Sequence, residues 1–194
     1  MFSKVAHNVW KQSLFFMLVA GTPLLLNAPV YARGITVNQV HTEVLDDVLY
    51  LNAAVDIKPG KAMLGALQEG VPLTFVYHIS ILRRRDYWPD ETVARLEQRY
   101  RLEYHALTQQ YFLVNLNSGS QFSFPSLEAA ISVLGTIVKL PLLDVNLLRS
   151  REQYSGQIQV GIDDEALPVP LRLLSYFSSD WRLKSDWYTW PIHF

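Results

Sequence analysis

The feature that most constrains the fold is an alternation of side-chain character along residues 95–105. One side of an extended chain is apolar here, at Leu96, Tyr100, Leu102 and Tyr104. The other side is charged or basic, at Arg95, Glu97, Arg99, Arg101, Glu103 and His105. Because successive side chains of a β-strand point to opposite faces, the pattern predicts a strand with one buried and one water-facing side. Such strands are typical of antiparallel sheets, so we expect the apolar side to be mainly buried. The side chains expected to be mainly exposed are Arg95, Glu97, Arg99 and Arg101.

The rest of the chain has many strand signals and few helix signals. Strands are predicted at residues 36–44, 48–57, 73–81, 111–114, 121–124, 154–162 and 181–190. A short helix is predicted at residues 61–69, ended by Gly70, and a second from its cap Ser126 through Val138 to a stop at Pro141. Residues 142–148 are either a further helical turn or an extended apolar segment, and residues 167–171 are too rich in proline for a central strand. We therefore expect a mainly β (α+β) fold, an antiparallel β-sandwich or sheet with two or three packed helices.

The N-terminal residues 1–32 have the composition of a secretory signal peptide. Lys4 and Lys11 form a basic start, an apolar run follows at residues 14–26, and Ala32 offers a small residue at a candidate cleavage site. The apolar run is shorter than the ~20 residues that a spanning helix needs. We predict cleavage after Ala32, which makes the mature protein periplasmic and leaves it without an integral membrane span. An uncleaved N-terminal anchor is the alternative interpretation.

The composition of residues 33–194 suits a single folded domain. The full sequence is 49% hydrophobic, with five Trp, ten Tyr and nine Phe, which is enough for a packed core. Cysteine is absent, so disulfides, thiolate nucleophiles and thiolate metal sites are ruled out, and an exported protein without cysteine fits a bacterial periplasm. Removing Lys4 and Lys11 leaves 15 of the 17 basic residues against 18 acidic ones. A net charge of about −3 predicts no general attraction to nucleic acid.

Motifs for catalysis or cofactor binding are missing from the sequence. There is no nucleophile elbow, no zinc-protease helix motif, no phosphate-binding glycine-rich loop and no dinucleotide fingerprint. The acidic residues 163–165 lack the spaced oxygen ligands of a calcium loop. The histidines beyond residue 32 are isolated in sequence, at His41, His78, His105 and His193. We therefore predict no catalytic residue, no metal site and no cofactor.

One segment of the sequence combines cations with aromatic rings. Arg83, Arg84 and Arg85 end the strand predicted from residue 73, and Tyr87 and Trp88 follow directly. Arg and Trp contribute much of the binding energy at interfaces, so these five residues are the candidate binding site. In the alternative interpretation the arginines belong to a solvated sheet face and pair with local carboxylates. Those carboxylates would be Asp86, Asp90, Glu97 and Glu103.

A second aromatic group lies near the C-terminus, at Trp181, Trp187, Tyr188 and Trp190. Trp187 and Trp190 are three residues apart, so a strand places their rings on opposite faces. We expect one of these two rings to be exposed.

Several short motifs occur in a characteristic order along the chain. They are residues 66–73 (ALQEGVPL), 84–90 (RRDYWPD) and 102–111 (LEYHALTQQY), then Ser123-Phe124, Leu167-Pro168-x-Pro170-Leu171 and Trp181-x-Leu183-x-Ser185-x-Trp187. Over nearly all of residues 33–194, the chain resembles an exported proteobacterial family known as domain of unknown function 4390. The resemblance implies a signal peptide, no established activity and no catalytic residues to carry over. The resemblance also implies a link to envelope signalling, because members of this family are often encoded near a membrane sensor kinase.

The sequence as a whole favours a non-enzymatic function. We expect an exported, periplasmic binding or protein-interaction domain whose partner is an envelope or membrane protein. The alternative is an envelope enzyme that acts on glycan through paired carboxylates. Its candidate residues are Asp90, Glu91, Asp163 and Asp164. A cleft lined by Trp with two carboxyl groups about 5–9 Å apart would favour the enzyme, whereas dispersed carboxylates would favour the binding domain.

Overall fold

The computed structural model describes residues 34–177, 181 and 183–194. The chain divides into two compact units, residues 1–31 and 32–194, and every described residue belongs to the second unit. The predicted signal peptide, residues 1–32, lies outside the described residues. None of the described helices is long and apolar enough to span a bilayer.

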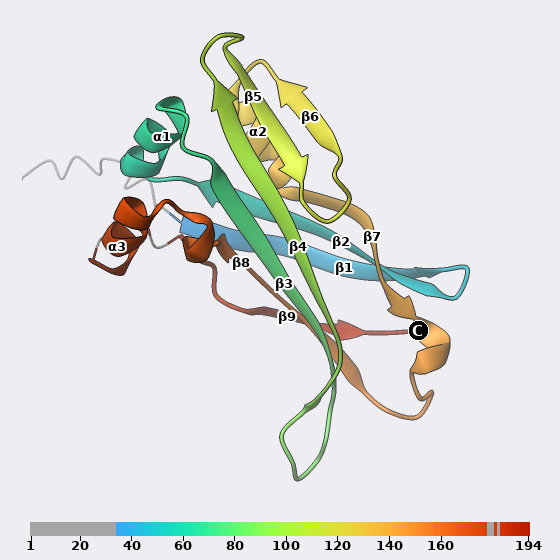
Figure 1. The fold of residues 1–194 in the computed structure, drawn as a ribbon. Coiled ribbons are helices and arrows are strands. Elements are labelled where there is room, and N and C mark those ends of the chain that lie inside the picture. The colour runs from blue at the N-terminus through green and yellow to red at the C-terminus, as the bar shows by residue number, and fades with distance from the viewer. Residues whose placement is uncertain (1–33, 178–180, 182) are drawn as a thin grey trace, which may run out of the picture. The chain divides into compact units, whose positions relative to one another are not determined.

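The described residues form two antiparallel sheets (Figure 1). The small sheet has the order β1-β2-β7 and consists of β1 (Gly34–Leu45), β2 (Val48–Lys58) and β7 (Thr136–Asp144). The large sheet has the order β6-β5-β4-β3-β8-β9 and consists of β3 (Leu73–Arg83), β4 (Glu91–His105), β5 (Gln110–Asn115), β6 (Gln121–Phe124), β8 (Tyr154–Ile162) and β9 (Tyr188–Ile192). In Figure 1 the strands β1 and β2 cross β3 and β4 at a steep angle. The predicted fold class is confirmed, as is each strand predicted before residue 163.

The core lies between the two sheets and consists of the faces that alternation predicted. On β3 the core side chains are at most 1% exposed, and they are Leu73, Phe75, Tyr77, Ile79 and Ile81. The small sheet contributes the buried residues of β2, which are Leu49, Leu51, Ala53, Val55 and Ile57. The opposite face of β3 is also largely covered, since Thr74, Val76 and Ser80 are buried. β3 therefore forms the middle of the large sheet, hydrogen-bonded to β4 on one side and β8 on the other.

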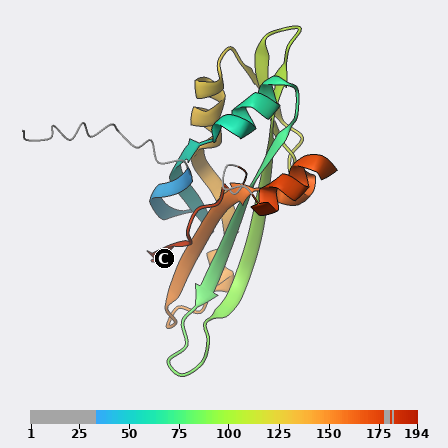
Figure 2. The ribbon, with the colours of Figure 1, turned by 90° about the vertical axis from the view of Figure 1, so that its left-hand side faces the viewer.

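The described residues also form three α-helices, α1 (Lys61–Gln68), α2 (Leu127–Leu134) and α3 (Val169–Phe177). Gly70 follows α1 with a φ of 86°, the left-handed conformation that favours glycine, as predicted. Ser126 caps α2 as predicted, because its Oγ accepts the backbone N–H of Ala129 at 3.3 Å. Figure 2 shows α2 and α3 on opposite sides of the large sheet. Of the proline-rich residues 167–171, the last three form the start of α3, which agrees with their exclusion from a central strand.

The second predicted helix was too long, since α2 ends at Leu134. Gly135 is buried, and its carbonyl oxygen accepts the backbone N–H of Val55 at 2.8 Å. A Cβ atom on Gly135 would lie 2.3 Å from the Val55 oxygen, so only glycine permits this approach to β2. The contact carries the chain into the small sheet as β7, where Val138 is 70% exposed instead of lying on a helix stripe.

Residues 142–148 combine the two predicted alternatives. The extended chain of β7 continues to Asp144, and a 3₁₀ turn, η1 (Val145–Leu147), follows. Asp144 caps this turn through its side chain, which accepts the backbone N–H of Asn146 at 2.8 Å.

β4 confirms the predicted faces, but its apolar side is less buried than expected. Leu102 is fully buried, whereas Leu96, Tyr100 and Tyr104 are only half-buried. β5 pairs with β4 only from Tyr100 to His105, so the first half of β4 has a neighbouring strand on one side alone. On the other face Arg95, Glu97 and Arg99 are exposed as predicted, and Arg101 is half-buried.

The strand predicted at residues 181–190 was correct only near its end. β9 begins at Tyr188, and the chain before it contacts β8 through separate backbone hydrogen bonds. Ser185 donates its N–H to the Val160 oxygen at 2.8 Å, for example. One of the two spaced tryptophans is exposed as expected, since Trp187 is 48% exposed and Trp190 is 5% exposed.

Candidate functional site

The five predicted site residues lie at the hairpin that joins β3 to β4. Residues 84–90, here called the tip loop, project beyond both sheets at the lower end of Figure 1. Tyr87 is 94% exposed and Trp88 is 75% exposed. Two adjacent aromatic side chains are therefore presented to solvent at the far end of a long hairpin.

Two of the three consecutive arginines hold the base of the tip loop. Arg83 and Arg85 both form ion pairs with the carboxylate of Glu91, across the hairpin on β4. The backbone N–H of Arg85 also donates to Asp90 Oδ1 at 3.3 Å. These contacts agree with local pairing for Arg83 and Arg85, although their shared carboxylate, Glu91, is not one of the four expected. They restrain the loop that carries the aromatic rings.

Arg84 behaves differently from its neighbours. Its backbone N–H donates to the Gln153 oxygen at 2.9 Å, which joins the tip loop to the segment before β8. Its guanidinium forms no ion pair within the described part of the chain. The side chain instead lines a cavity of about 740 Å³ beside the loop.

This cavity brings together three segments that are far apart in sequence. Its polar lining includes Arg84, Asp90, Ser150, Glu152 and Thr189, and its aromatic lining includes Tyr154, Trp190 and Phe194. Tyr154 and Phe194 contact each other, with ring centroids 5.7 Å apart. The tip loop, the start of β8 and the end of β9 meet here because β8 lies between β3 and β9 in the sheet. The volume is in the range of small-molecule sites.

Sequence reasoning missed the parts of the cavity that come from β8 and β9. Glu152 and Thr189 belong to no motif, and only the sheet order brings them near Arg84. One signal was available. Gly156 lies inside the predicted strand at residues 154–162, and an interior strand glycine often marks a close approach. In the structure the ring of Trp190 packs directly on Gly156, where a Cβ atom would lie 2.2 Å from Trp190 Cζ2.

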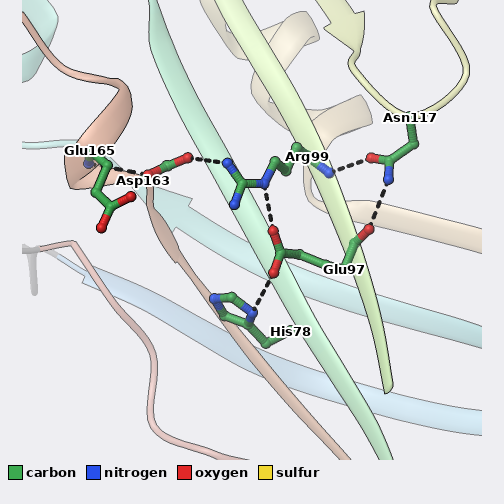
Figure 3. Close-up of polar contacts among 6 residues, drawn as sticks. All are labelled: His78, Glu97, Arg99, Asn117, Asp163 and Glu165. Atoms are coloured by element: carbon green, nitrogen blue, oxygen red, sulfur yellow. Dashed lines mark hydrogen bonds and ion pairs between the residues drawn. The ribbon is translucent and has the colours of Figure 1, made fainter. Parts of the chain in front are cut away.

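Arg99, on the water-facing side of the sheet, belongs to a polar network, whereas Arg101 pairs with Glu103 outside that network. Figure 3 shows its members, which are His78, Glu97, Arg99, Asn117, Asp163 and Glu165. Arg99 donates from Nε to Glu97 at 2.5 Å and from a terminal nitrogen to Asp163 at 2.6 Å. The hydrogen bond to Glu97 is the main reason that the pKa of Arg99 lies above its usual value, and the nearby Asp163 acts in the same direction. His78 Nδ1 lies 3.5 Å from the second oxygen of Glu97.

The network joins elements rather than forming an open site. The Arg99 backbone N–H donates to Asn117 Oδ1 at 2.7 Å, and Asn117 Nδ2 donates to the backbone oxygen of Glu97 at 2.9 Å. These two bonds hold the β5–β6 turn to β4. Asp163 caps the 3₁₀ turn η2 (Asp164–Ala166), accepting the N–H of Glu165 at 3.1 Å. Residues 163–165 thus form a capped acidic turn. No group of three or more metal-ligating side chains occurs in residues 34–177, 181 and 183–194.

The four carboxylates of the enzyme alternative do not lie together. Glu91 pairs with Arg83 at one end of β3, whereas the Asp163 N–H bonds to the Thr74 oxygen near the other end. Nine residues of extended chain separate these ends by about 30 Å. Glu91 is held by two arginines, and burial raises the pKa of Asp164 above its usual value. Among the four, only Asp90 lines the cavity, together with Glu152.

Comparison with known proteins identifies one family model that matches the chain. It is described as a domain of unknown function (DUF4390) and matches residues 32–191. No curated protein and no solved structure matches the chain.

Proposed function

The chain belongs to the DUF4390 family, and on this premise we propose that it is an exported, non-enzymatic binding domain that attaches to a component of the cell envelope through its tip loop. The observation that carries this proposal is the exposure of Tyr87 and Trp88 at the end of the β3–β4 hairpin. Aromatic side chains of this kind dominate the binding energy of many interfaces. Because Tyr87 and Trp88 are exposed next to each other on a projecting loop, they are available to a binding partner and do not contribute to the protein's own core.

The contacts at the base of the tip loop support a binding role. Glu91 holds Arg83 and Arg85, and Gln153 holds the backbone of Arg84. A loop restrained in this way loses less conformational freedom when it binds. The guanidinium of Arg84, which has no ion pair in the part of the chain that the structure describes, adds a preference for an anionic group, because Arg pairs with carboxylate and phosphate through two parallel hydrogen bonds.

Export and periplasmic location are part of the same proposal. They rest on Lys4, Lys11, the apolar residues 14–26 and the small residue Ala32, which together have the composition of a cleaved signal peptide. A partner in the envelope follows from that location. The link to envelope signalling, which the family resemblance implies, belongs to the proposal as well.

The four carboxylates of the enzyme alternative do not share one cleft, which supports binding over glycan hydrolysis by those residues. A retaining or inverting glycosidase needs two carboxyl groups about 5–9 Å apart across one cleft. Asp163 and Asp164 lie at the end of β3 opposite Asp90 and Glu91. The arrangement therefore supports a domain that recognises a partner.

The proposal is tested with a double variant of the tip loop and a matched control on the same hairpin. Arg84→Glu with Trp88→Ala reverses the free charge and removes an exposed ring. The control, Arg95→Glu with Val93→Ala, reverses a charge and truncates a partly exposed apolar side chain on β4, where Arg95 is exposed without an ion pair in the described residues and Val93 is 40% exposed. Mature protein recovered from cells that express the full chain is incubated with isolated cell envelopes, and the bound fraction is measured.

We expect the tip-loop variant to lose binding at least about tenfold, the scale of an interface hot spot. The control should bind like the wild type. Both variants should melt within about 2 °C of the wild type, because exposed substitutions change stability little. Unchanged binding of the tip-loop variant would contradict the proposal, and unfolding of that variant would show that the loop is structural.

A further inference from the structure

We propose that the envelope component bound by the tip loop is the surface of a phospholipid bilayer, with Tyr87 and Trp88 inserted at the headgroup level and unpaired arginines on the lipid phosphates. This inference rests on the proposed function and names its partner.

Two loops form this end. The tip loop lies beside the segment that leads from η1 to β8, because Arg84 N–H bonds to the Gln153 oxygen and Arg83 pairs with Tyr154 in the sheet register. In Figure 1 both loops lie at the lower end of the large sheet. We call six exposed residues at this end the docking end, which consists of Arg84, Tyr87 and Trp88 of the tip loop, Leu147 at the end of η1, and Arg149 and Arg151 after it.

The apolar members of the docking end are of the types that bilayer interfaces prefer. Trp and Tyr are enriched at the headgroup level of membranes, where an apolar ring and a polar N–H or O–H are both satisfied. Tyr87 and Trp88 are 94% and 75% exposed, and Leu147 on the neighbouring loop is 73% exposed. Two aromatic side chains at the tip of a narrow hairpin can enter a headgroup layer without moving the sheets. A protein interface would more typically need a broad complementary surface.

The cations of the docking end complement lipid phosphates. Arg84, Arg149 and Arg151 are exposed and form no ion pair within the described part of the chain. Guanidinium groups bind phosphate through paired hydrogen bonds. Asp86, Asp90 and Glu152 are exposed among them, so the carboxylates equal these three arginines in number. We therefore expect the aromatic rings to supply most of the affinity and the arginines to supply only a small preference for anionic lipid.

The opposite end of the same hairpin supplies a control. The loop between β4 and β5 contains Leu107, which is 101% exposed, and the 15 residues of β4 separate it from the tip loop. At the rise of a strand this is about 50 Å. Leu107→Ala thus removes an equally exposed apolar side chain far from the docking end.

The experiment measures co-sedimentation of the mature protein with two kinds of vesicle. One kind is phosphatidylcholine alone, and the other contains a quarter phosphatidylglycerol. We expect the wild type to bind both kinds of vesicle and to bind the anionic vesicles more strongly.

Tyr87→Ala with Trp88→Ala should weaken binding at least about tenfold, given the aromatic area removed from the interface. Arg84→Glu with Arg149→Glu should remove the preference for anionic vesicles, and Leu107→Ala should change nothing. Lipids brominated near the headgroup should quench wild-type tryptophan fluorescence more than that of Trp88→Phe.

The outcomes separate this inference from the proposed function. If neither vesicle binds the wild type, while envelope binding still depends on the tip loop and is abolished by protease treatment of the envelopes, the partner is a protein and the lipid inference is wrong. If vesicle binding is equal in the wild type and the aromatic variant, the docking end is wrongly placed. If excess inorganic phosphate at matched ionic strength displaces the protein, the site recognises free phosphate rather than a lipid surface.

Discussion

Tyr77 shows how one side chain ties the large sheet to the helix that covers it. Its ring is fully buried on β3 and meets Tyr100 edge-on, with centroids 5.6 Å apart. Its hydroxyl donates to the backbone oxygen of Leu134, the last residue of α2, at 2.5 Å. That bond satisfies a carbonyl that the end of the helix would otherwise leave without a partner. Burial, with a smaller effect from Tyr100, raises the pKa of Tyr77 far above its usual value of 10.0.

Tyr77→Phe should therefore lower the free energy of unfolding at neutral pH. The variant should also lose less of its stability than the wild type does when the pH is raised. Removing the hydroxyl leaves the Leu134 oxygen unpaired, at a cost of about 1 kcal/mol. In the wild type the unfolded chain ionises Tyr77 near its ordinary pKa, while the folded chain keeps it neutral. The stabilisation is thus fully present below about pH 10 and is lost as the pH rises beyond it. Urea midpoints for both proteins at about pH 8 and pH 11 measure this difference. If the urea midpoint of the wild type falls no more between the two pH values than that of Tyr77→Phe, the raised pKa is contradicted.

At the scale of elements, the edge of the large sheet depends on a glycine that accommodates an indole. Trp190 on β9 is 5% exposed and packs on Gly156 of β8, its partner in the register. The indole N–H is buried without a hydrogen bond in the described structure, at a cost of about 1–3 kcal/mol. Burying roughly 200 Å² of ring surface contributes about 5 kcal/mol, so the packing outweighs that loss.

Gly156→Ala should destabilise the protein by about 1–3 kcal/mol, because the new methyl group would overlap the Trp190 ring. Gly65→Ala is the control. Gly65 lies inside α1, where nothing is within 4 Å of an added Cβ atom. Alanine there should stabilise the helix by about 1 kcal/mol. Chemical unfolding of both variants measures the change in the free energy of unfolding, which should be negative for Gly156→Ala and positive for Gly65→Ala. Stabilisation by Gly156→Ala would show that the Trp190 ring does not pack on β8.

β4 offers a second comparison between its two faces. Leu102 is fully buried between the sheets, whereas Arg95 is exposed on the other face. Leu102→Ala should cost about 2–5 kcal/mol, the usual range for a buried leucine. Arg95→Ala should leave the unfolding free energy nearly unchanged. Equal losses in the two variants would refute the assignment of the faces.

At the scale of the whole molecule, the unit of residues 32–194 is held by a sandwich core whose two sheets leave the β3–β4 hairpin projecting. The projection follows from strand lengths. β3 and β4 pair up to Arg83 and Glu91, beyond which residues 84–90 have no sheet beneath them. A binding loop placed there can tolerate substitution without loss of the core.

The proposed export makes a prediction about the mature chain. Cleavage after Ala32 should give a native protein that begins at Arg33, because the basic start, the apolar run and the small residue stand in the order that signal peptidase requires. N-terminal sequencing and intact mass of protein from a periplasmic extract measure this directly. A full-length chain retained in the membrane fraction would support the uncleaved anchor instead.

Much of the fold follows from short-range patterns in the sequence. Alternation in residues 73–81 and 95–105 determined strands and faces, because the period of two is a property of the extended backbone. Ser126 and Gly70 determined helix ends through the caps they form. The same patterns identified Arg84 and Trp88 as neighbours on one exposed hairpin, since seven residues between two paired strands leave few arrangements.

Only the tertiary structure decided where these segments meet. Val138 has the spacing of a helix residue, yet it lies on β7 because the backbone at Gly135 contacts Val55 of a strand far away in sequence. Arg83 and Arg85 share the Glu91 carboxylate, whereas Arg84 has no ion pair among the described residues, and the β3–β4 register decides which arginines face Glu91. The cavity beside Arg84 exists because β8 and β9 follow β3 in the sheet, which brings Glu152 and Trp190 to the tip loop. Local sequence sets the direction of each side chain, but the order of the strands sets which side chains share a site.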